Sequence, residues 1–567
     1  MNPHLRSHLG ALAGFVAATI IATWPLAIDL TRGVPYGGDA FQFIWNGWWF
    51  AKAANDPSLS IWFTPFQYAP HGAPLALHDL SPLNAYLQAW LRAFVGDFGA
   101  YNLLVIFHYI LGAWGAYILA WYLTGNRAGS VIAGFIYGFS THHAMHLSQL
   151  STVSSGWVPL SVYYMLKYTR DAGPRDGVLA ALMLLAAAMS SWYHLAFAGV
   201  VFFGLMLIGQ IGLRDSLGGW RRWQRAIIPW LVAILILSPI LCMAFTEALK
   251  QPVEWRVGMG RLYFLDPAWA IIPPPHHPIC GPLVRPLIPT IPGNMTEGVA
   301  SLGPVAIVLG ILAWFRRNAT SRAWCWLGLI LFLLALGPTI AILGMKTGIP
   351  GPFRLWSMIP GLNMVRVPAR FVAPFTLTLA LSAAGFIAGL RPRWRTGGRR
   401  IFLLWVLPIL ALFETLVIPI PMTGSELNLP ALSQLSSIYR NATGDPNPPD
   451  LMVNFPALPE RVQFMYQQTL HRIPTIDGAL SNPPPGARDF LFHFNWNAEY
   501  LRSIGVDLVL YQYWAATSSL GEVFQVGTGE QYPVEWRGQK VPPLVFFREV
   551  EKYRVIYEDD KMIVFVP

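Results

Sequence analysis

A series of long apolar segments separated by short basic loops constrains the fold most strongly. A helix needs about 20 apolar residues to cross ~30 Å of hydrocarbon, and about 11 segments approach that length. The first segment is long for a signal peptide and lacks a clear cleavage site, so we interpret it as a retained span. The predicted spans cover roughly 9–30, 101–123, 128–143, 152–169, 176–192, 194–213, 226–247, 299–315, 323–343, 371–390 and 401–419.

The composition excludes a soluble protein. Of the 567 residues, 54% are hydrophobic and 12% are charged, and the mean hydropathy is +0.44. The net charge of +10 does not indicate a nucleic-acid partner, because the basic residues form short clusters between spans. Cys242, Cys280 and Cys325 lie far apart and show neither metal-ligand spacing nor a disulfide framework.

The distribution of basic residues predicts the orientation. With the N-terminus in the cytoplasm, every second loop carries arginine or lysine, and the short opposite loops near 144–151 and 191–194 carry none. Four long segments then lie outside the cell: 31–99, 248–298, 344–370 and the tail from about 420. We therefore expect a multi-pass protein of the inner or plasma membrane with an extracytoplasmic tail.

The tail has the composition of a soluble domain. It is polar, and strands are expected at 451–455 and 506–511, the second after a short helix at 498–504. Residues 553–557 and 562–566 flank Glu-Asp-Asp-Lys and predict a closing hairpin. The predicted fold is thus a polytopic α-helical membrane module, residues 1–420, followed by a small extracytoplasmic α/β domain, residues 421–567.

The first outer loop, residues 31–99, is rich in aromatic residues. A helix beginning at Asp39 would place Asp39, Gln42 and Asn46 on one face and Trp45, Trp48 and Trp49 elsewhere. Such a helix is expected to lie flat at the membrane surface, with its tryptophans among the headgroups. Ser81 and Pro82 start a second helix with an apolar stripe that extends to Val95.

Polar side chains gather at the predicted outer ends of the spans, although such groups are costly at membrane depth. This one-sided distribution predicts a site at the outer leaflet. Besides Asp39 and Gln42, the candidate residues are His78, Asp79, His146, Gln149, His194, Glu297, Arg366 and Arg370.

Several of these residues have simpler interpretations. Asp39 or Glu297 can cap a helix, and His146 can mark the point where a helix meets water. Arg366 and Arg370 are four residues apart and fit either one phosphate or lipid headgroups in general. No H-E-x-x-H motif is present, so no metal ligand is assigned.

Short motifs spread over nearly the whole chain resemble one superfamily. They are Gly38-Asp39 before the tryptophan-rich helix, Pro70-His71-Gly72 leading to His78-Asp79, Gly99-Ala-Tyr-Asn102, His146-Leu-Ser-Gln149, Trp157-Val-Pro159, His277-Pro278, Glu297 before Leu302-Gly303, Arg366-Val-Pro-Ala-Arg370-Phe371 and Asn454-Phe-Pro456. The arrangement resembles the C-type (GT-C) glycosyltransferases, and most closely the bacterial YfhO-like multispan proteins.

The resemblance implies a glycosyltransferase that takes its sugar from a polyprenyl-phosphate donor and inverts the anomeric carbon. It places an acidic residue of the first outer loop, here Asp39, at the catalytic centre. Some relatives use a divalent cation, but no D-x-D motif accompanies Asp39, so Mg²⁺ or Mn²⁺ stays open.

The function expected from residues and resemblance together is transfer of a sugar to an extracytoplasmic glycan, lipid or protein acceptor. Asp39 would act as base, and Arg366 and Arg370 would bind the lipid phosphate with help from His146 or His194. Two alternatives stand beside it: a lipid or glycolipid transporter or flippase, and a non-catalytic assembly protein for surface polysaccharide.

Overall fold

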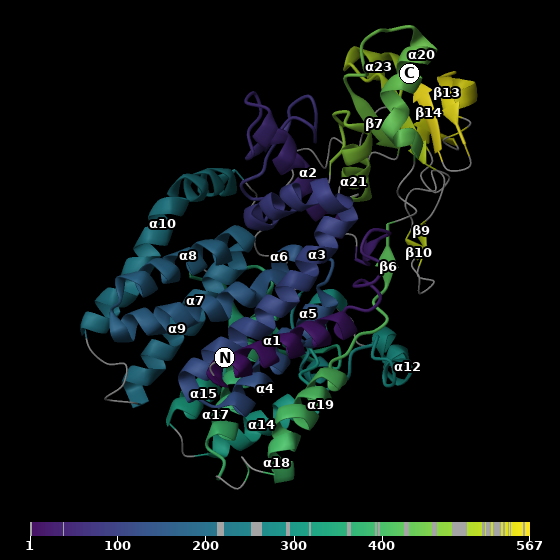
Figure 1. Cartoon of the computed structure of the whole chain (residues 1–567). Helices are drawn as coiled ribbons and strands as arrows, with labels where there is room; N and C mark the ends of the chain where they lie inside the picture. Colours follow the sequence, from purple (N-terminus) through teal and green to yellow (C-terminus); the bar gives the residue numbers. More distant parts are fainter. Residues whose placement is uncertain are drawn as a thin grey trace. The chain divides into compact units, whose positions relative to one another are not determined.

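The computed structural model (Figure 1) forms two compact units. Unit 1 comprises Met1–Ile28, Asn102–Leu241 and Pro252–Ile420, and unit 2 comprises Asp29–Tyr101, Cys242–Gln251 and Pro421–Pro567. The first outer loop belongs to unit 2 together with the tail, so unit 1 does not contain all of residues 1–420, and the predicted domain division at 420 stays a prediction. The structure describes residues 3–37, 39–212, 220–250, 263–290, 295–316, 319–359, 365–391, 394, 397–424, 430–455, 462–478, 496–512, 516–517, 523–524, 534–536, 539–541, 544, 546–559 and 562–567.

Helices lie over all of the predicted apolar segments. They are α1 (Pro3–Ala22), α3 (Pro82–Thr124), α4 (Arg127–Gly138), α7 (Trp157–Asp171), α8 (Pro174–Ser190), α9 (Trp192–Gly212), α10 (Trp220–Leu249), α14 (Pro304–Phe315), α15 (Ala319–Ala335), α17 (Val372–Ala388), α18 (Gly397–Ile401) and α19 (Leu407–Glu414). Shorter elements connect them: α5 (Thr141–Met145), α6 (Leu150–Val153), α12 (Gly281–Val284), α13 (Met295–Gly298), β4 (Thr339–Ile342), β5 (Met345–Pro350) and α16 (Phe353–Ser357).

Four helical stretches in the described residues are long and apolar enough to cross a membrane: Leu5–Ala22, Pro82–Thr124, Arg222–Leu249 and Pro368–Ala388. Three shorter apolar helices, Trp192–Ile208, Pro304–Phe315 and Ser321–Ala335, add to them. The chain is therefore a helical membrane protein, while the number of spans stays a prediction. Helix α3 contains both the predicted surface helix and the next predicted span, which meet at a kink at Gly96, whose φ is 72°.

The core of unit 1 is built around α17, which packs against α4, α14 and α15. Small residues allow the helices to approach closely. A Cβ atom on Gly129 of α4 would lie 2.7 Å from the backbone oxygen of Ala384 in α17. The start of α4 is secured by Asn126, whose side chain accepts a hydrogen bond from the Gly129 N–H.

Unit 2 contains a four-stranded sheet in the order β13-β14-β8-β7. The strands are β7 (Met452–Phe455), β8 (Leu508–Gln512), β13 (Arg554–Glu558) and β14 (Met562–Val566), with β7 parallel to β8 and the other pairs antiparallel. This arrangement agrees with the predicted strands and closing hairpin. The helices of the unit are α2 (Asp39–Asn55), α20 (Leu435–Thr443), α21 (Val462–His471) and α23 (Ala498–Ser503).

Four two-stranded ribbons complete unit 2. They are β1 (Val34–Pro35) with β6 (Met422–Thr423), β2 (Phe63–Thr64) with β3 (Ala73–Pro74), β9 (Ala516–Thr517) with β10 (Val523–Phe524), and β11 (Val534–Trp536) with β12 (Gln539–Val541). The first of these ribbons ties the start of the first outer loop to the start of the tail.

The prediction that the tryptophans of α2 lie among lipid headgroups is wrong. Trp45, Trp48 and Trp49 are at most 4% exposed and share a hydrophobic core with side chains of the tail. Helix α2 packs against α21, which Figure 1 shows beside it, and Trp45 Nε1 donates a 2.8 Å hydrogen bond to Gln468 Oε1. The aromatic surface is buried in protein because the tail covers it.

The first part of α3 fits the interfacial prediction better. Tyr86, Trp90 and Phe94 are 57–70% exposed, and the rings of Trp90 and Phe94 are 5.1 Å apart. An apolar aromatic stripe open to the surroundings is typical of a helix that lies in a membrane surface.

Candidate functional site

The candidate site of unit 1 is built around the buried carboxylate of Glu297. This residue lies in the short helix α13, and its side chain is only 5% exposed. Arg370, in the 3₁₀ turn that precedes α17, donates to Glu297 Oε1 from Nε at 3.0 Å and from Nη2 at 2.6 Å. A guanidinium that reaches a carboxylate through two nitrogens forms a strong and geometrically specific pair.

His146 contacts the same carboxylate from the other side. Its Nε2 lies 3.1 Å from Glu297 Oε2, and its Nδ1 lies 2.7 Å from the backbone oxygen of His142. Both partners are oxygen atoms, so the ring is held between the Glu297 carboxylate and the backbone of His142. The His142 ring packs against it with a centroid separation of 4.2 Å.

Arg370 has further contacts that hold its guanidinium plane. Its Nη2 donates to Gln149 Oε1 at 3.2 Å, and Gln149 Oε1 also accepts from the Thr152 hydroxyl. The guanidinium lies 4.8 Å from the centroid of the Tyr193 ring. The Tyr193 hydroxyl accepts the backbone N–H of Arg366 at 3.1 Å, so one tyrosine orients both predicted arginines.

The charge of the Glu297 carboxylate is compensated within the cluster. Burial by itself raises the pKa of Glu297, but Arg370 and His146 outweigh burial and hold the pKa well below its usual value. One carboxylate thus faces the Arg370 guanidinium and the His146 ring, and Arg366 adds a second cation nearby in the chain. The arrangement suits the binding of an anion that offers several oxygens, such as a phosphate.

His194 lies at the edge of this cluster, in the first turn of α9. Its ring is 2% exposed, forms a hydrogen bond with the backbone of Thr152 and lies within electrostatic range of Arg370. Its Nδ1 has no hydrogen-bond partner among the residues that the structure describes. The structure therefore brings five predicted residues together in unit 1: His146, Gln149, His194, Glu297 and Arg370. The backbone of a sixth, Arg366, is connected to them through Tyr193.

The other predicted site residues belong to unit 2. Asp39 is half-buried at the first position of α2, where its backbone N–H donates to the Gly37 oxygen at 2.6 Å and its charge acts on the buried Tyr101. Gln42, one turn later on the same helix, is 7% exposed.

His78 holds the loop that follows α2 in place. Its Nε2 lies 2.9 Å from Asn46 Oδ1, and the Asn46 amide donates to the backbone oxygens of Asp79 and Leu80. Burial lowers the pKa of His78 to about 3, so this ring is neutral at physiological pH. These contacts favour a structural role for His78, while Asp79 next to it is half-buried.

A metal site does not emerge from the described residues. They contain no group of three or more His, Cys, Asp or Glu side chains arranged to hold an ion. No step through a divalent cation is therefore derived, and a role for Mg²⁺ or Mn²⁺ stays a prediction.

The sequence did not identify Tyr193 and Thr152 as parts of the site. Tyr193 orients Arg366 and Arg370, and Thr152 supports Gln149 and His194. The available signal for Tyr193 was its position beside His194 at the start of an apolar segment.

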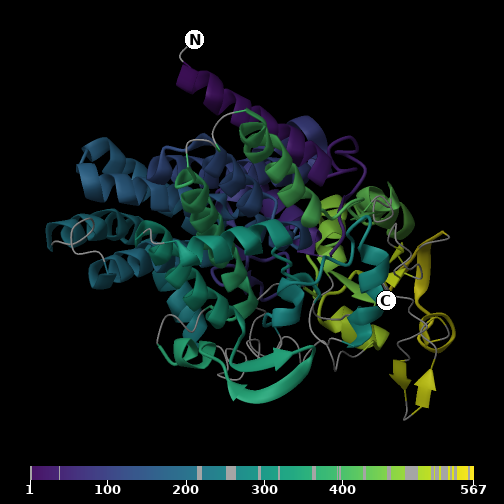
Figure 2. The same ribbon diagram turned by 90° about the horizontal axis from the view of Figure 1, so that it is seen from below.

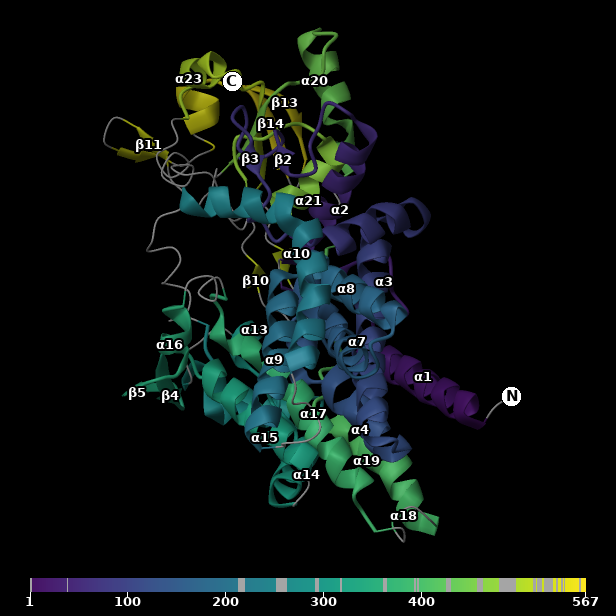
Figure 3. The ribbon, with the colours of Figure 1, turned by 90° about the vertical axis from the view of Figure 1, so that its left-hand side faces the viewer.

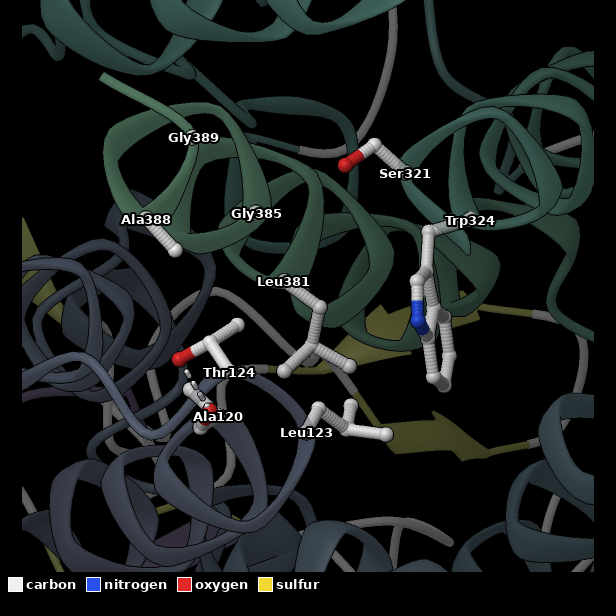
Figure 4. Close-up of a pocket in the computed structure, with 9 residues that line it drawn as sticks. All are labelled: Ala120, Leu123, Thr124, Ser321, Trp324, Leu381, Gly385, Ala388 and Gly389. Atoms are coloured by element: carbon white, nitrogen blue, oxygen red, sulfur yellow. Dashed lines mark hydrogen bonds between the residues drawn. The ribbon is translucent and has the colours of Figure 1, made fainter. Parts of the chain in front are cut away.

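A cavity of about 210 Å³ in unit 1 is separate from the cluster (Figure 4). It is lined by small and apolar side chains around Thr124, Ser321 and Gly389, at the end of α3, the start of α15 and the end of α17. Arg370 lies at the opposite end of α17. The cavity is therefore not part of the candidate site.

Comparison with known proteins identifies the fold. No protein-family model matches the sequence, and no curated protein is significantly similar to it. The structure resembles the archaeal oligosaccharyltransferase AglB from Archaeoglobus fulgidus, solved in complex with an inhibitory peptide and a dolichol-phosphate. That match has a TM-score of 0.51 and 13% identity and covers 98% of this chain and 79% of AglB.

A second solved structure is similar over the whole length of both chains. ArnT from Cupriavidus metallidurans, in the apo state, matches at 12% identity over 98% of each chain, with a TM-score of 0.47 that is too low to indicate a shared fold by itself. The nearer likeness to YfhO-like proteins stays a prediction. From the match to AglB, the chain has the fold of that archaeal oligosaccharyltransferase, and its membership of the GT-C glycosyltransferases stays a prediction.

Proposed function

We propose that this protein is a membrane glycosyltransferase that moves a sugar from a polyprenyl-phosphate donor to an acceptor outside the cytoplasm. The observation that carries the proposal is the buried cluster of Glu297, Arg370 and His146, which lies next to helix ends in a chain with the fold of AglB. AglB, which has this fold, was solved with a dolichol-phosphate, a polyprenyl phosphate of the class proposed here.

The leaving group determines what the cluster has to do. When the bond between the anomeric carbon and the phosphate oxygen breaks, the lipid phosphate keeps the electron pair and gains negative charge. Arg370 stabilises that charge by hydrogen bonds from its charged guanidinium, with Arg366 as a further cation, while His146 acts through the Glu297 carboxylate that it contacts. Gln149 and Tyr193 hold the guanidinium of Arg370 in place, which avoids the cost of reorienting it during the reaction.

Asp39 is our candidate for the base. In an inverting transfer, a carboxylate removes the proton of the acceptor hydroxyl while the oxygen attacks the anomeric carbon from the side opposite the phosphate. The support for Asp39 is the motif that it shares with the superfamily and its half-buried position at the start of α2. Its predicted neighbours Gln42 and Asp79 are proposed to contact the sugar.

The test is donor turnover by the purified protein in lipid nanodiscs. A radiolabelled polyprenyl-phosphate sugar is incubated with a cell-envelope acceptor fraction, and the label transferred to the acceptor is counted. Asp39→Asn should lower transfer by about 10²-fold to 10⁴-fold and leave donor binding intact. Asp29→Asn, which removes an exposed carboxylate of the same unit, is the matched control and should transfer normally.

The same assay separates the alternative functions. A flippase would move the labelled donor across the bilayer without consuming it, and an assembly protein would bind the donor or the polymer without turnover. Transfer by Asp39→Asn at the level of the Asp29→Asn control would remove Asp39 from the role of base.

A further inference from the structure

A hairpin of unit 1 exposes a row of large apolar side chains. Strands β4 and β5 form the hairpin, and α16 follows directly (Figures 2 and 3). Leu343 at its tip is 52% exposed, Met345 is 70% exposed, and Leu355 of α16 is 70% exposed. The patch also includes Ile342, Ile349, Met358 and Ile359. An apolar surface of this kind marks a contact site for a partner or a membrane.

The turn of the hairpin has an unfavourable residue at its tip. Leu343 and Gly344 both have positive φ, 51° and 78°, as in a type I′ turn. That turn favours Asn-Gly, and a leucine in the left-handed region is sterically disfavoured. The Gly344 N–H donates to Asp266 Oδ2 at 2.8 Å, which holds the tip. A rigid turn that displays leucine despite its conformational cost suggests a function for the apolar side chain.

The exposed charges on the hairpin and on α16 have one sign. The sequence contains no Asp or Glu between residues 298 and 413. Lys346 of β5 and Arg354 of α16 are both exposed among the apolar side chains. Asp266, which faces the turn from the neighbouring segment, is 3% exposed and is occupied by two backbone N–H groups. An apolar surface with exposed cations complements a lipid surface that carries phosphate groups.

The hairpin continues from a helix that exposes apolar side chains. Strand β4 begins shortly after α15 ends at Ala335, and α15 exposes Leu329 and Ile330 by 38% and 47%. The rings of Phe353 and Trp356 in α16 pack against Phe371 at 6.3 and 5.0 Å, next to Arg370. The exposed element is therefore attached to the end of the bundle that carries the phosphate-binding candidate.

We infer that the hairpin and α16 insert into the lipid leaflet on the side of the Glu297–Arg370 cluster. Leu343, Met345 and Leu355 enter the boundary between headgroups and acyl chains, and Lys346 and Arg354 contact lipid phosphates. Insertion holds the Glu297–Arg370 cluster at the depth of the lipid headgroups. This inference does not depend on glycosyl transfer, so the two proposals fail separately.

Fluorescence quenching by lipid tests the insertion. Cys242, Cys280 and Cys325 are replaced by serine, and circular dichroism checks that the protein still folds. An environment-sensitive dye is then attached to Leu343→Cys or, as a control in the tail domain, to Ser503→Cys. Each protein is reconstituted into phosphatidylcholine vesicles with and without phosphatidylglycerol, to which doxyl-labelled lipid is added.

We expect doxyl lipid to quench the dye at 343 strongly and the dye at 503 weakly, with more quenching at 343 when phosphatidylglycerol is present. Equal quenching at the two positions would overturn the inference. The inference would also be overturned if the dye at 343 self-quenched with rising protein concentration in detergent, since a second copy of the protein would then cover the patch.

Leu343→Asn separates insertion from folding. Asparagine suits the left-handed turn, so the hairpin keeps its shape while it loses the apolar side chain. With the dye on Met345→Cys, we expect quenching by doxyl lipid to fall about twofold or more in this variant. Lys346→Gln should instead remove only the preference for phosphatidylglycerol. Unchanged quenching in Leu343→Asn would contradict the proposed role of the tip.

Discussion

Two buried carboxylates, one in each unit, have opposite surroundings. Glu297 of unit 1 is 5% exposed and meets the guanidinium of Arg370 and the ring of His146. Asp477 of unit 2 is 2% exposed, and in the described part of the chain it meets amides: the Asn454 backbone N–H at 3.2 Å and the Asn454 side chain at 2.9 Å. Neutral hydrogen bonds compensate a buried charge less well than cations do.

The pKa values follow from these surroundings. Burial raises the pKa of Asp477 to about 6, against the opposing hydrogen bonds from Asn454, whereas the cations keep the pKa of Glu297 well below its usual value. The comparison indicates that unit 1 keeps an ionised cluster suited to an anionic ligand. In unit 2, the neighbouring Thr475, Gln468 and Trp45 form a neutral network that joins the first outer loop to the tail.

The largest effect is expected when the cluster of unit 1 loses its main cation. Arg370→Ala leaves the Glu297 carboxylate buried without its guanidinium partner, which should destabilise the protein by about 3 to 5 kcal/mol and reduce donor turnover by about 10²-fold. Thermal unfolding in detergent and the transfer assay measure the two effects. An unchanged unfolding temperature in Arg370→Ala would mean that the Arg370–Glu297 pair contributes nothing to stability.

A double variant sharpens this test. Arg370→Gln with Glu297→Gln removes both charges, so no buried carboxylate is left without its partner, and most of the lost stability should return. Turnover should stay low because the phosphate still lacks its guanidinium. If turnover recovered together with stability, Arg370 would act only in folding.

The next effect is a dependence on pH in unit 2. The folded-state pKa of Asp477 is about 6 against 3.8 for the ordinary group, so its stabilising contribution is present below pH 4 and is lost as pH rises through 6. The loss amounts to about 3 kcal/mol by pH 7. The free energy of unfolding, measured by denaturant titration with tryptophan fluorescence, should therefore fall between pH 4 and pH 7. Asp477→Asn should abolish most of this fall.

Glu297 should show the opposite sign. Its pKa is lowered in the folded state, so its contribution is present above about pH 4.5 and is lost as pH falls below that value. Below about pH 4.5, the unfolding temperature of Glu297→Gln should depend less on pH than that of the unmodified protein. The pH dependence due to Asp477 should not change. If Glu297→Gln and Asp477→Asn changed the pH dependence of stability in the same way, the distinction between the two carboxylates would be contradicted.

The smallest effect concerns the neutral network. Trp45→Phe removes one hydrogen bond to Gln468, whose Oε1 still accepts from Gln67, so about 1 kcal/mol should be lost. Turnover should be unaffected, because the Trp45 side chain is fully buried. A loss of turnover without a loss of stability would instead assign α2 a direct part in the reaction.

The sequence predicted much of the cluster of unit 1 because its members occupy equivalent places in the chain. His146, Glu297 and Arg370 all lie next to the ends of apolar segments on one predicted side, and helix ends on one side of a bundle are neighbours in space. The specific pairing was not predictable. The proposal that both arginines bind phosphate did not anticipate that Arg370 already meets Glu297 through two nitrogens.

The error over the tryptophans of α2 has a physical origin. Trp45, Trp48 and Trp49 have the same composition and spacing whether lipid headgroups or another protein segment covers them. The tail that buries them lies about 400 residues later in the chain, as the 423-residue separation of Trp45 and Gln468 illustrates. Local periodicity therefore revealed an aromatic face and misassigned the partner of that face.

The sequence by itself determined the membrane character, the helical segments, the small sheet of the tail and the concentration of polar residues at one set of helix ends, because apolar length and charge act locally along the chain. Only the tertiary structure decided that Glu297 is ionised between Arg370 and His146, that Asp477 meets the neutral amides of Asn454, and that α2 belongs with the tail. Those outcomes depend on which distant groups exclude water from each other, and no local pattern encodes that.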